Sequence, residues 1–216
     1  MSGYFSSTPK TRKSKETKMK IIVERLVDKM LYENMISQED TEWYIYSLQI
    51  VIEKTIGLST ILLLGVLFDY LFQTIGFWLV FSGIRKYSGG FHLKHFWSCY
   101  LFSVGTYRIF VQVYQKFVFE ITSTQMILVT IVCLGIYSIG AVNNQEIHWN
   151  KKECLENTSL TRISVLIIYV VMLGLILTGT DASYLWFMSW GLFLVFVSLL
   201  LEKLVEKFKL YDKRKQ

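Results

Sequence analysis

The sequence has almost no proline, little charge and too few cysteines for a disulfide framework. Pro9 is the single proline among 216 residues, charged residues make up 19% of the chain, and hydrophobic residues make up 52%. A soluble domain of this length carries more charge and interrupts its apolar stretches with turn residues. One of the three cysteines, Cys133, lies inside an apolar tract. The composition therefore excludes an ordinary soluble domain and a disulfide-rich secreted one.

Long apolar tracts dominate the sequence after its first fifty residues. They cover residues 56–84, 96–117, 121–142, 163–178 and 184–201. A helix needs about 20 mostly apolar residues to cross a bilayer, and a helix satisfies its backbone polar groups internally in lipid. The first tract is long enough for two helices, with Asp69 and Gln73 near a tight turn between them. The sequence predicts an all-α, polytopic membrane helical bundle of about six transmembrane helices.

The N-terminal region differs from these tracts because it is polar and has no apolar core of a cleaved signal peptide. Residues 1–18 are predicted to be a flexible tail. In residues 19–54, Ile22, Leu26 and Met30 recur at four-residue steps between charged residues, which predicts an amphipathic helix. A second such helix is expected from Thr41. Both helices fit the membrane interface or a cytoplasmic cap. They are expected to begin a single domain, which continues through a bundle (55–202) and ends in a basic tail (203–216).

The distribution of charge predicts the orientation of the bundle. The net charge is +6, but the basic residues gather at the ends of the apolar tracts, which is typical of membrane topology and not of nucleic-acid binding. The N-terminal region, the segment from Arg85 to Lys94, the loop with Lys151 and the C-terminal tail all fall on one side. By the positive-inside rule this side, with both termini, is cytoplasmic in a multi-pass cell-membrane protein. No internal repeat supports an inverted-repeat transporter.

One segment on the basic side carries the residues suited to chemistry. It reads Arg85-Lys86-Tyr-Ser88-Gly89-Gly90-Phe-His92-Leu-Lys-His95-Phe-Trp-Ser-Cys99. The glycine pair predicts a break in the helix where a substrate backbone can approach. Cys99 is a candidate nucleophile, because imidazoles and cations nearby favour the reactive thiolate. On a regular helix His95 would reach Cys99, whereas His92 would lie about 10 Å away along the axis. Spacing alone therefore favours His95 as the base, and His92 requires a bend at the glycines.

The pattern of Arg85, the glycine pair, His92 and Cys99 between two spans of a six-span protein resembles the accessory gene regulator B (AgrB) family. The resemblance implies a membrane cysteine endopeptidase of quorum sensing, with His92 and Cys99 as catalytic residues. Arg85, Lys86, Ser88, Gly89, Gly90 and His95 are then expected to bind substrate or to support the site. It further implies an AgrD-like propeptide as partner, an acyl-enzyme leading to a cyclic thiolactone, a homodimer and no cofactor.

Other interpretations of the same residues remain open at the level of sequence. His92, His95 and Cys99 form a possible set of ligands for zinc or copper. A peptide transporter without catalysis is an alternative function, supported by the polar residues inside the tract 96–117, and a structural scaffold is a third. The pair His148 and Cys154 is expected in a solvated loop, and Cys133 in the core.

Overall fold

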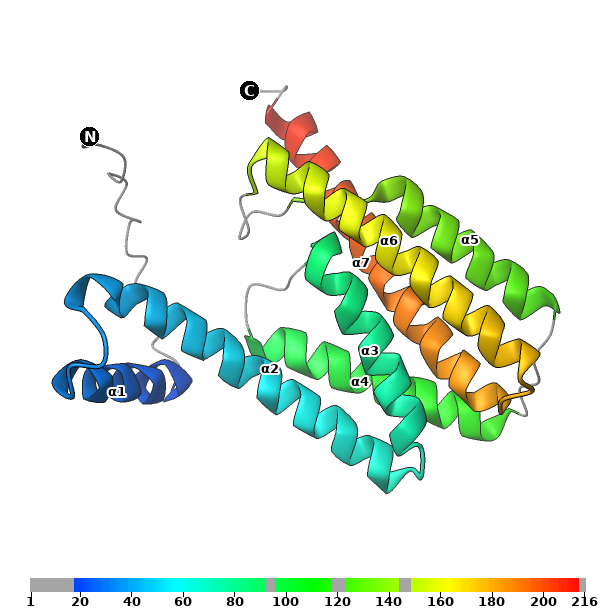
Figure 1. The fold of residues 1–216 in the computed structure, drawn as a ribbon, viewed down its shortest axis with the longest axis horizontal. Coiled ribbons are helices and arrows are strands. Elements are labelled where there is room, and N and C mark those ends of the chain that lie inside the picture. The colour runs from blue at the N-terminus through cyan, green and yellow to red at the C-terminus, as the bar shows by residue number, and fades with distance from the viewer. Residues whose placement is uncertain (1–17, 92–95, 118–122, 144–148, 214–216) are drawn as a thin grey trace. The chain divides into compact units, whose positions relative to one another are not determined.

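The fold is entirely helical in the part of the chain that the structure describes. This computed structural model describes residues 18–91, 96–117, 123–143 and 149–213. These residues form a short 3-10 helix (Gln38–Asp40) and the helices α1 (Lys18–Tyr32), α2 (Thr41–Leu67), α3 (Leu71–Ser88), α4 (Phe96–Lys116), α5 (Ser123–Ile139), α6 (Lys151–Leu177) and α7 (Ala182–Lys213) (Figure 1). The prediction of an all-α membrane bundle is confirmed.

The chain divides into two compact units, residues 1–56 and 57–216. In the first unit the predicted helix is present as α1, but the residues that it buries differ from those expected. Val23 and Val27 are fully buried, whereas Ile22 and Leu26 are exposed. The apolar residues of α1 therefore divide between a buried side and a side that stays open.

The helix α2 joins two elements that the sequence analysis separated. An interfacial helix was expected from Thr41 and a transmembrane helix from Ile56, yet Thr41–Leu67 is one continuous helix. The sequence from Thr41 contains no glycine or proline before Gly57. No local signal therefore favours a helix break between the two expected helices. The tight turn expected around Asp69 is present, since Asp69 has a φ of 62° and the amide of Tyr70 donates to the carbonyl of Gly65 at 2.8 Å.

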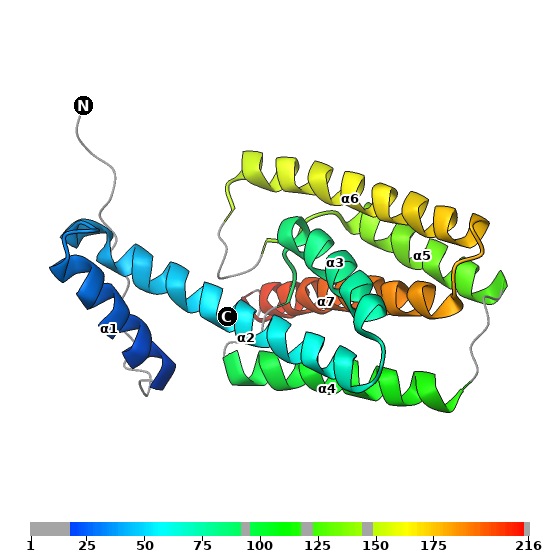
Figure 2. The ribbon, with the colours of Figure 1, turned by 60° about the horizontal axis from the view of Figure 1, so that its bottom comes forward.

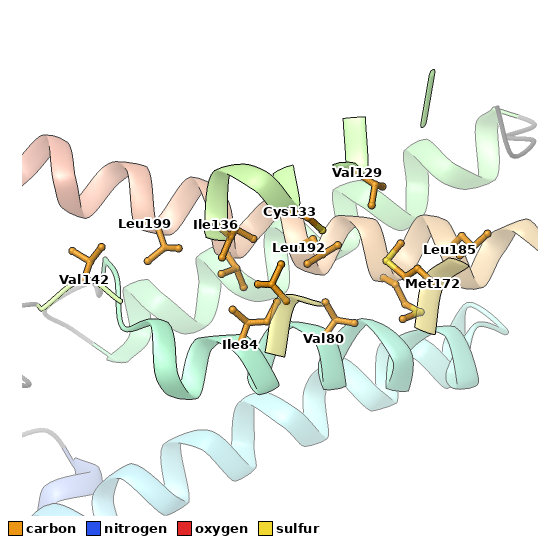
Figure 3. Packing of buried hydrophobic residues seen from close by; sticks show 13 residues of the cluster. Val80, Ile84, Val129, Cys133, Ile136, Val142, Met172, Leu185, Leu192 and Leu199 are labelled. Atoms are coloured by element: carbon orange, nitrogen blue, oxygen red, sulfur yellow. The ribbon is translucent and has the colours of Figure 1, made fainter. Parts of the chain in front are cut away.

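The main core of the second unit lies among α3, α5, α6 and α7. Helix α3 packs most extensively on α7 and also contacts α6, while α5 contacts both α6 and α7 (Figure 2). Val80 and Ile84 of α3 gather with Cys133 of α5 and Leu192 and Leu199 of α7 in one buried cluster (Figure 3). The expected core position of Cys133 is confirmed. This packing fixes the end of α3 against the C-terminal half of α7.

A second, aromatic cluster attaches α4 to this core. Phe77 of α3, Tyr107 of α4 and Phe187 of α7 are buried together. The hydroxyls of Tyr107 and Thr74 share a hydrogen bond of 2.5 Å in the buried interior, which satisfies two polar groups that would otherwise be costly to bury. The contacts determine where α4 lies, and thus where the residues of its first turn lie.

Two further helices, α6 and α7, extend about twelve residues beyond the predicted apolar tracts. Helix α6 begins at Lys151, twelve residues before the predicted start, because Asn150 and Glu153 form a capping box in which the amide of Asn150 donates to the Glu153 carboxylate at 2.8 Å. Cys154, expected in an unstructured loop, therefore lies in the first turn of α6; its partner His148 lies outside the described residues. Helix α7 extends to Lys213, well beyond the predicted end of its apolar tract.

Among the described residues, three helical segments are long and apolar enough to cross a membrane. They are Gln38–Leu67, Lys151–Leu177 and Ala182–Phe208, and a shorter apolar helix covers Thr124–Ile139. Helices α3 and α4 are present where transmembrane helices were predicted, although neither reaches the same length and hydropathy. Helix α3 has 18 residues with Arg85 and Lys86 in its last turn, and α4 carries Arg108 in its middle. The fold is that of a helical membrane bundle.

Candidate active site

The site is built around a sharp bend directly after α3. The helix ends at Ser88, and Gly89 and Gly90 follow with φ angles of 63° and 93°. Gly89 has a ψ of −128°, a combination that residues with a side chain rarely adopt. A Cβ atom on Gly89 would also lie 2.4 Å from the carbonyl oxygen of Val142. The predicted break at the glycine pair is present, and both its conformation and its packing require glycine.

The loop after α5 holds the bend from one side. The amide of Val142 donates to the carbonyl of Ser88 at 2.9 Å, and the amide of Gly90 donates to the carbonyl of Val142 at 3.4 Å. Val142 and Gly89 thus form an isolated parallel bridge. Ser88 is fully buried, and its hydroxyl has no hydrogen-bond partner among the described residues. The segment from Ser88 to Gly90 is therefore enclosed and fixed in position.

Arg85 holds the same bend from the other side. One nitrogen of its guanidinium, Nη1, donates to the carbonyl of Gly89 and, at 2.7 Å, to the hydroxyl of Ser198 on α7. The other, Nη2, donates to the carbonyl of Phe91. The amide of Phe91 in turn donates to the backbone carbonyl of Ser198 at 3.0 Å. A planar guanidinium presents several donors in a fixed geometry, so Arg85 fixes the carbonyls on both sides of Gly90.

Cys99 lies in the first turn of α4. It is the fourth residue of the helix, half-buried, and forms no disulfide. Arg85 interacts electrostatically with Cys99 and with the carboxylate of Glu202 on α7. A helix N-terminus and a neighbouring guanidinium both favour the thiolate over the thiol. The arrangement therefore provides conditions in which a cysteine acts as a nucleophile.

The remaining predicted site residues lie around this centre or outside the described part. His92 and His95 lie outside the described residues. Lys86 is exposed, with its ammonium 5.2 Å from the ring centre of Tyr87. Within the residues that are described, no three His, Cys, Asp or Glu side chains come together as a possible metal site.

Two residues at the site were missed by the sequence analysis. Ser198 and Glu202 lie four residues apart, so they share one face of α7. Glu202 is 8% exposed, which is unusual for a carboxylate and requires a compensating cation. The sequence did offer one signal for Glu202, because it follows the apolar run 199–201, and charged residues within membrane segments commonly serve a function. Arg85 is more than 100 residues away in the chain, and only the fold reveals its hydrogen bond to Ser198 and its electrostatic interaction with Glu202.

The described chain is a helical membrane bundle in which an arginine holds a glycine bend after α3, and Cys99 lies in the first turn of α4. The family model of accessory gene regulator B (AgrB) matches residues 19–200, and the chain belongs to this family. Membership places the protein in the peptide processing of agr quorum sensing, and AgrB proteins are in general peptidase-like processing proteins. No curated protein and no solved structure matches the chain significantly.

Proposed function

We propose that this protein is a membrane cysteine endopeptidase that cleaves an AgrD-like propeptide, with Cys99 as nucleophile and His92 as general base. The observation that carries the proposal is the position of Cys99 in the first turn of α4, within electrostatic reach of Arg85. The same arginine holds the carbonyl of Phe91, the residue directly before His92. A bend anchored in this way supports the return of the chain toward Cys99, which a straight helix would not permit.

The proposed reaction passes through an acyl-enzyme. The imidazole of His92 takes the proton of the Cys99 thiol, and the thiolate attacks the scissile carbonyl. The imidazolium of His92 then protonates the leaving amine as the peptide bond breaks, and the N-terminal part of the propeptide remains attached to Cys99 as a thioester. A cysteine of the propeptide then gives its proton to the imidazole and attacks the same carbonyl. The Cys99 thiolate leaves, and the product is a cyclic thiolactone. One thioester replaces another, so the second step needs no further energy source.

The proposed reaction also needs donors for the oxyanion that forms at the carbonyl. The hydroxyl of Ser88 is our candidate, because it is buried and has no acceptor among the described residues. Backbone amides at the glycine bend are a second source. Arg85 is proposed to position the bend and to favour the thiolate of Cys99, and the exposed Lys86 to attract acidic residues of the propeptide.

We further propose a multi-pass topology with both termini and the catalytic segment in the cytoplasm, following the distribution of basic residues.

We also propose a homodimer, because the surface of α4 supports a partner subunit. Arg108, Gln112 and Gln115 fall on one side of the helix, and all three are exposed. Polar side chains facing lipid are costly, and a second copy would cover them. Gln112→Cys in a Cys99→Ser background should give dimers that depend on an oxidant, whereas exclusively monomeric protein would contradict the proposal.

The test of the catalytic assignment is cleavage of the propeptide by the purified protein in proteoliposomes. Cys99→Ala and His92→Ala should each abolish cleavage, because each removes one half of the reacting pair. His95→Ala should retain most of the activity, and the matched control Cys154→Ala should be fully active. If Cys99→Ala still cleaves, the endopeptidase assignment is wrong. If His95→Ala alone is inactive, the base is His95.

A further inference from the structure

We propose that Ser198 and Glu202 of α7 are positioning residues of the Cys99 site, acting through Arg85. This inference rests on the proposed function and adds a third helix to the site. The residues 85–99 were the only part of the sequence in which chemistry was expected. The structure connects this segment to a helix that begins almost a hundred residues later in the chain.

Ser198 makes two contacts with the bend. Its hydroxyl accepts from Nη1 of Arg85 at 2.7 Å and donates to the carbonyl of Val195 at 2.7 Å. Its backbone carbonyl accepts from the amide of Phe91 at 3.0 Å. The carbonyl of Val195 thus orients the hydroxyl so that its lone pairs face the guanidinium. A hydrogen bond to a charged donor of this kind is stronger and more directional than a neutral one.

Glu202 supplies a negative charge to the surroundings of this partly buried cation. It lies one turn beyond Ser198 on α7, is 8% exposed, and interacts electrostatically with Arg85. Arg85 interacts electrostatically with Cys99 as well. Removing one of two opposite charges from a partly buried site is unfavourable, so the carboxylate of Glu202 favours the position of the guanidinium in which it holds the bend.

The first experiment measures kcat and KM of propeptide cleavage for variants of Ser198. Ser198→Ala should lower kcat by about tenfold, because one charge-assisted hydrogen bond is lost and the reacting groups lose alignment. KM should change less than about twofold, because no propeptide contact is removed. Ser198→Thr should restore kcat, since it keeps the hydroxyl. The matched control is Ser189→Ala, because Ser189 bonds only to the carbonyl of Leu185 on the same helix, at 2.6 Å, and it should behave as wild type.

The second experiment is a double-mutant cycle between Arg85 and Glu202. Glu202→Gln should lower kcat, but it should cause no further loss in an Arg85→Gln background if it acts through the arginine. The thermal unfolding temperature should fall in Arg85→Gln, which removes three hydrogen bonds of the guanidinium, and Glu202→Gln should lower it no further in that background. Glu206→Gln, an exposed change on the same helix, is the control.

The outcomes separate this inference from the proposed function. If Cys99→Ala is inactive but Ser198→Ala and Glu202→Gln retain the kcat of wild type, the positioning role is wrong and the endopeptidase assignment remains. Additive losses in the Arg85 and Glu202 cycle would also overturn the positioning role. If Ser198→Ala does not fold, Glu202→Gln and its cycle with Arg85→Gln decide the matter, because glutamine keeps the size and polarity of the native glutamate.

Discussion

The bend at Gly89 makes a quantitative prediction. In Gly89→Ala the new Cβ would lie 2.4 Å from the carbonyl oxygen of Val142, an approach that real Cβ atoms do not make. The backbone conformation, with φ 63° and ψ −128°, costs an alanine about 1–3 kcal/mol. Overpacking against the backbone adds about 1–3 kcal/mol. The loop at Val142 must therefore move, and the hydrogen bonds that it makes to Ser88 and Gly90 are lost.

The expected result is a fall in kcat of about 100-fold, because a displacement of about 1 Å at the reacting groups lowers the reaction rate by about this factor. The assay is propeptide cleavage in proteoliposomes, together with the thermal unfolding temperature in detergent. Gly83→Ala, on the preceding helix α3, is the control, since a Cβ there would meet nothing within 4 Å and alanine favours the helix by about 1 kcal/mol. Wild-type activity of Gly89→Ala, or equal losses in both variants, would refute the reasoning.

Three further predictions concern other parts of the protein. Tyr107→Phe should lower the free energy of unfolding by about 1 kcal/mol in denaturation experiments, since it removes the buried hydrogen bond to Thr74. Hydrogen bonds from the hydroxyl and then the amide of Ser183 lower the pKa of Asp181. The charged carboxylate of Asp181 therefore stabilises the fold fully at pH values above its ordinary pKa of about 3.9, and this stabilisation is lost as the pH falls through the lowered pKa. Asp181→Asn should flatten this acid dependence of the unfolding temperature. Chelators should leave propeptide cleavage unchanged, and activity that returns only with added zinc would contradict the thiol mechanism.

The sequence predicted the bend of the site because its cause is local. Adjacent glycines after a helix that ends in basic residues permit positive φ angles, whatever surrounds them. The packing of Cys133 was predicted for a similar reason, since an isolated cysteine in an apolar helix is usually a core residue. The start of α6 was also a local signal: Asn150 and Glu153 have the spacing of a capping box, but the hydropathy of the following tract concealed it.

The contacts between distant segments could not be predicted in the same way. Val142 follows α5 and Ser198 belongs to α7, yet both bind the bend after α3. Their side-chain types carry no signature of this role, because valine contributes only its backbone. The polar residues of the tract 96–117 gave an ambiguous signal, since they also support a peptide transporter; in the described chain Arg108, Gln112 and Gln115 are exposed on α4.

The residue at position 85 has to supply both a positive charge near Cys99 and donors for several acceptors at once. A lysine would supply a charge near Cys99, but its single ammonium has no planar set of donors for two carbonyls and a hydroxyl. Arg85 satisfies all three acceptors at once, which is why a cation is tolerated beside the apolar core of α3 and α7.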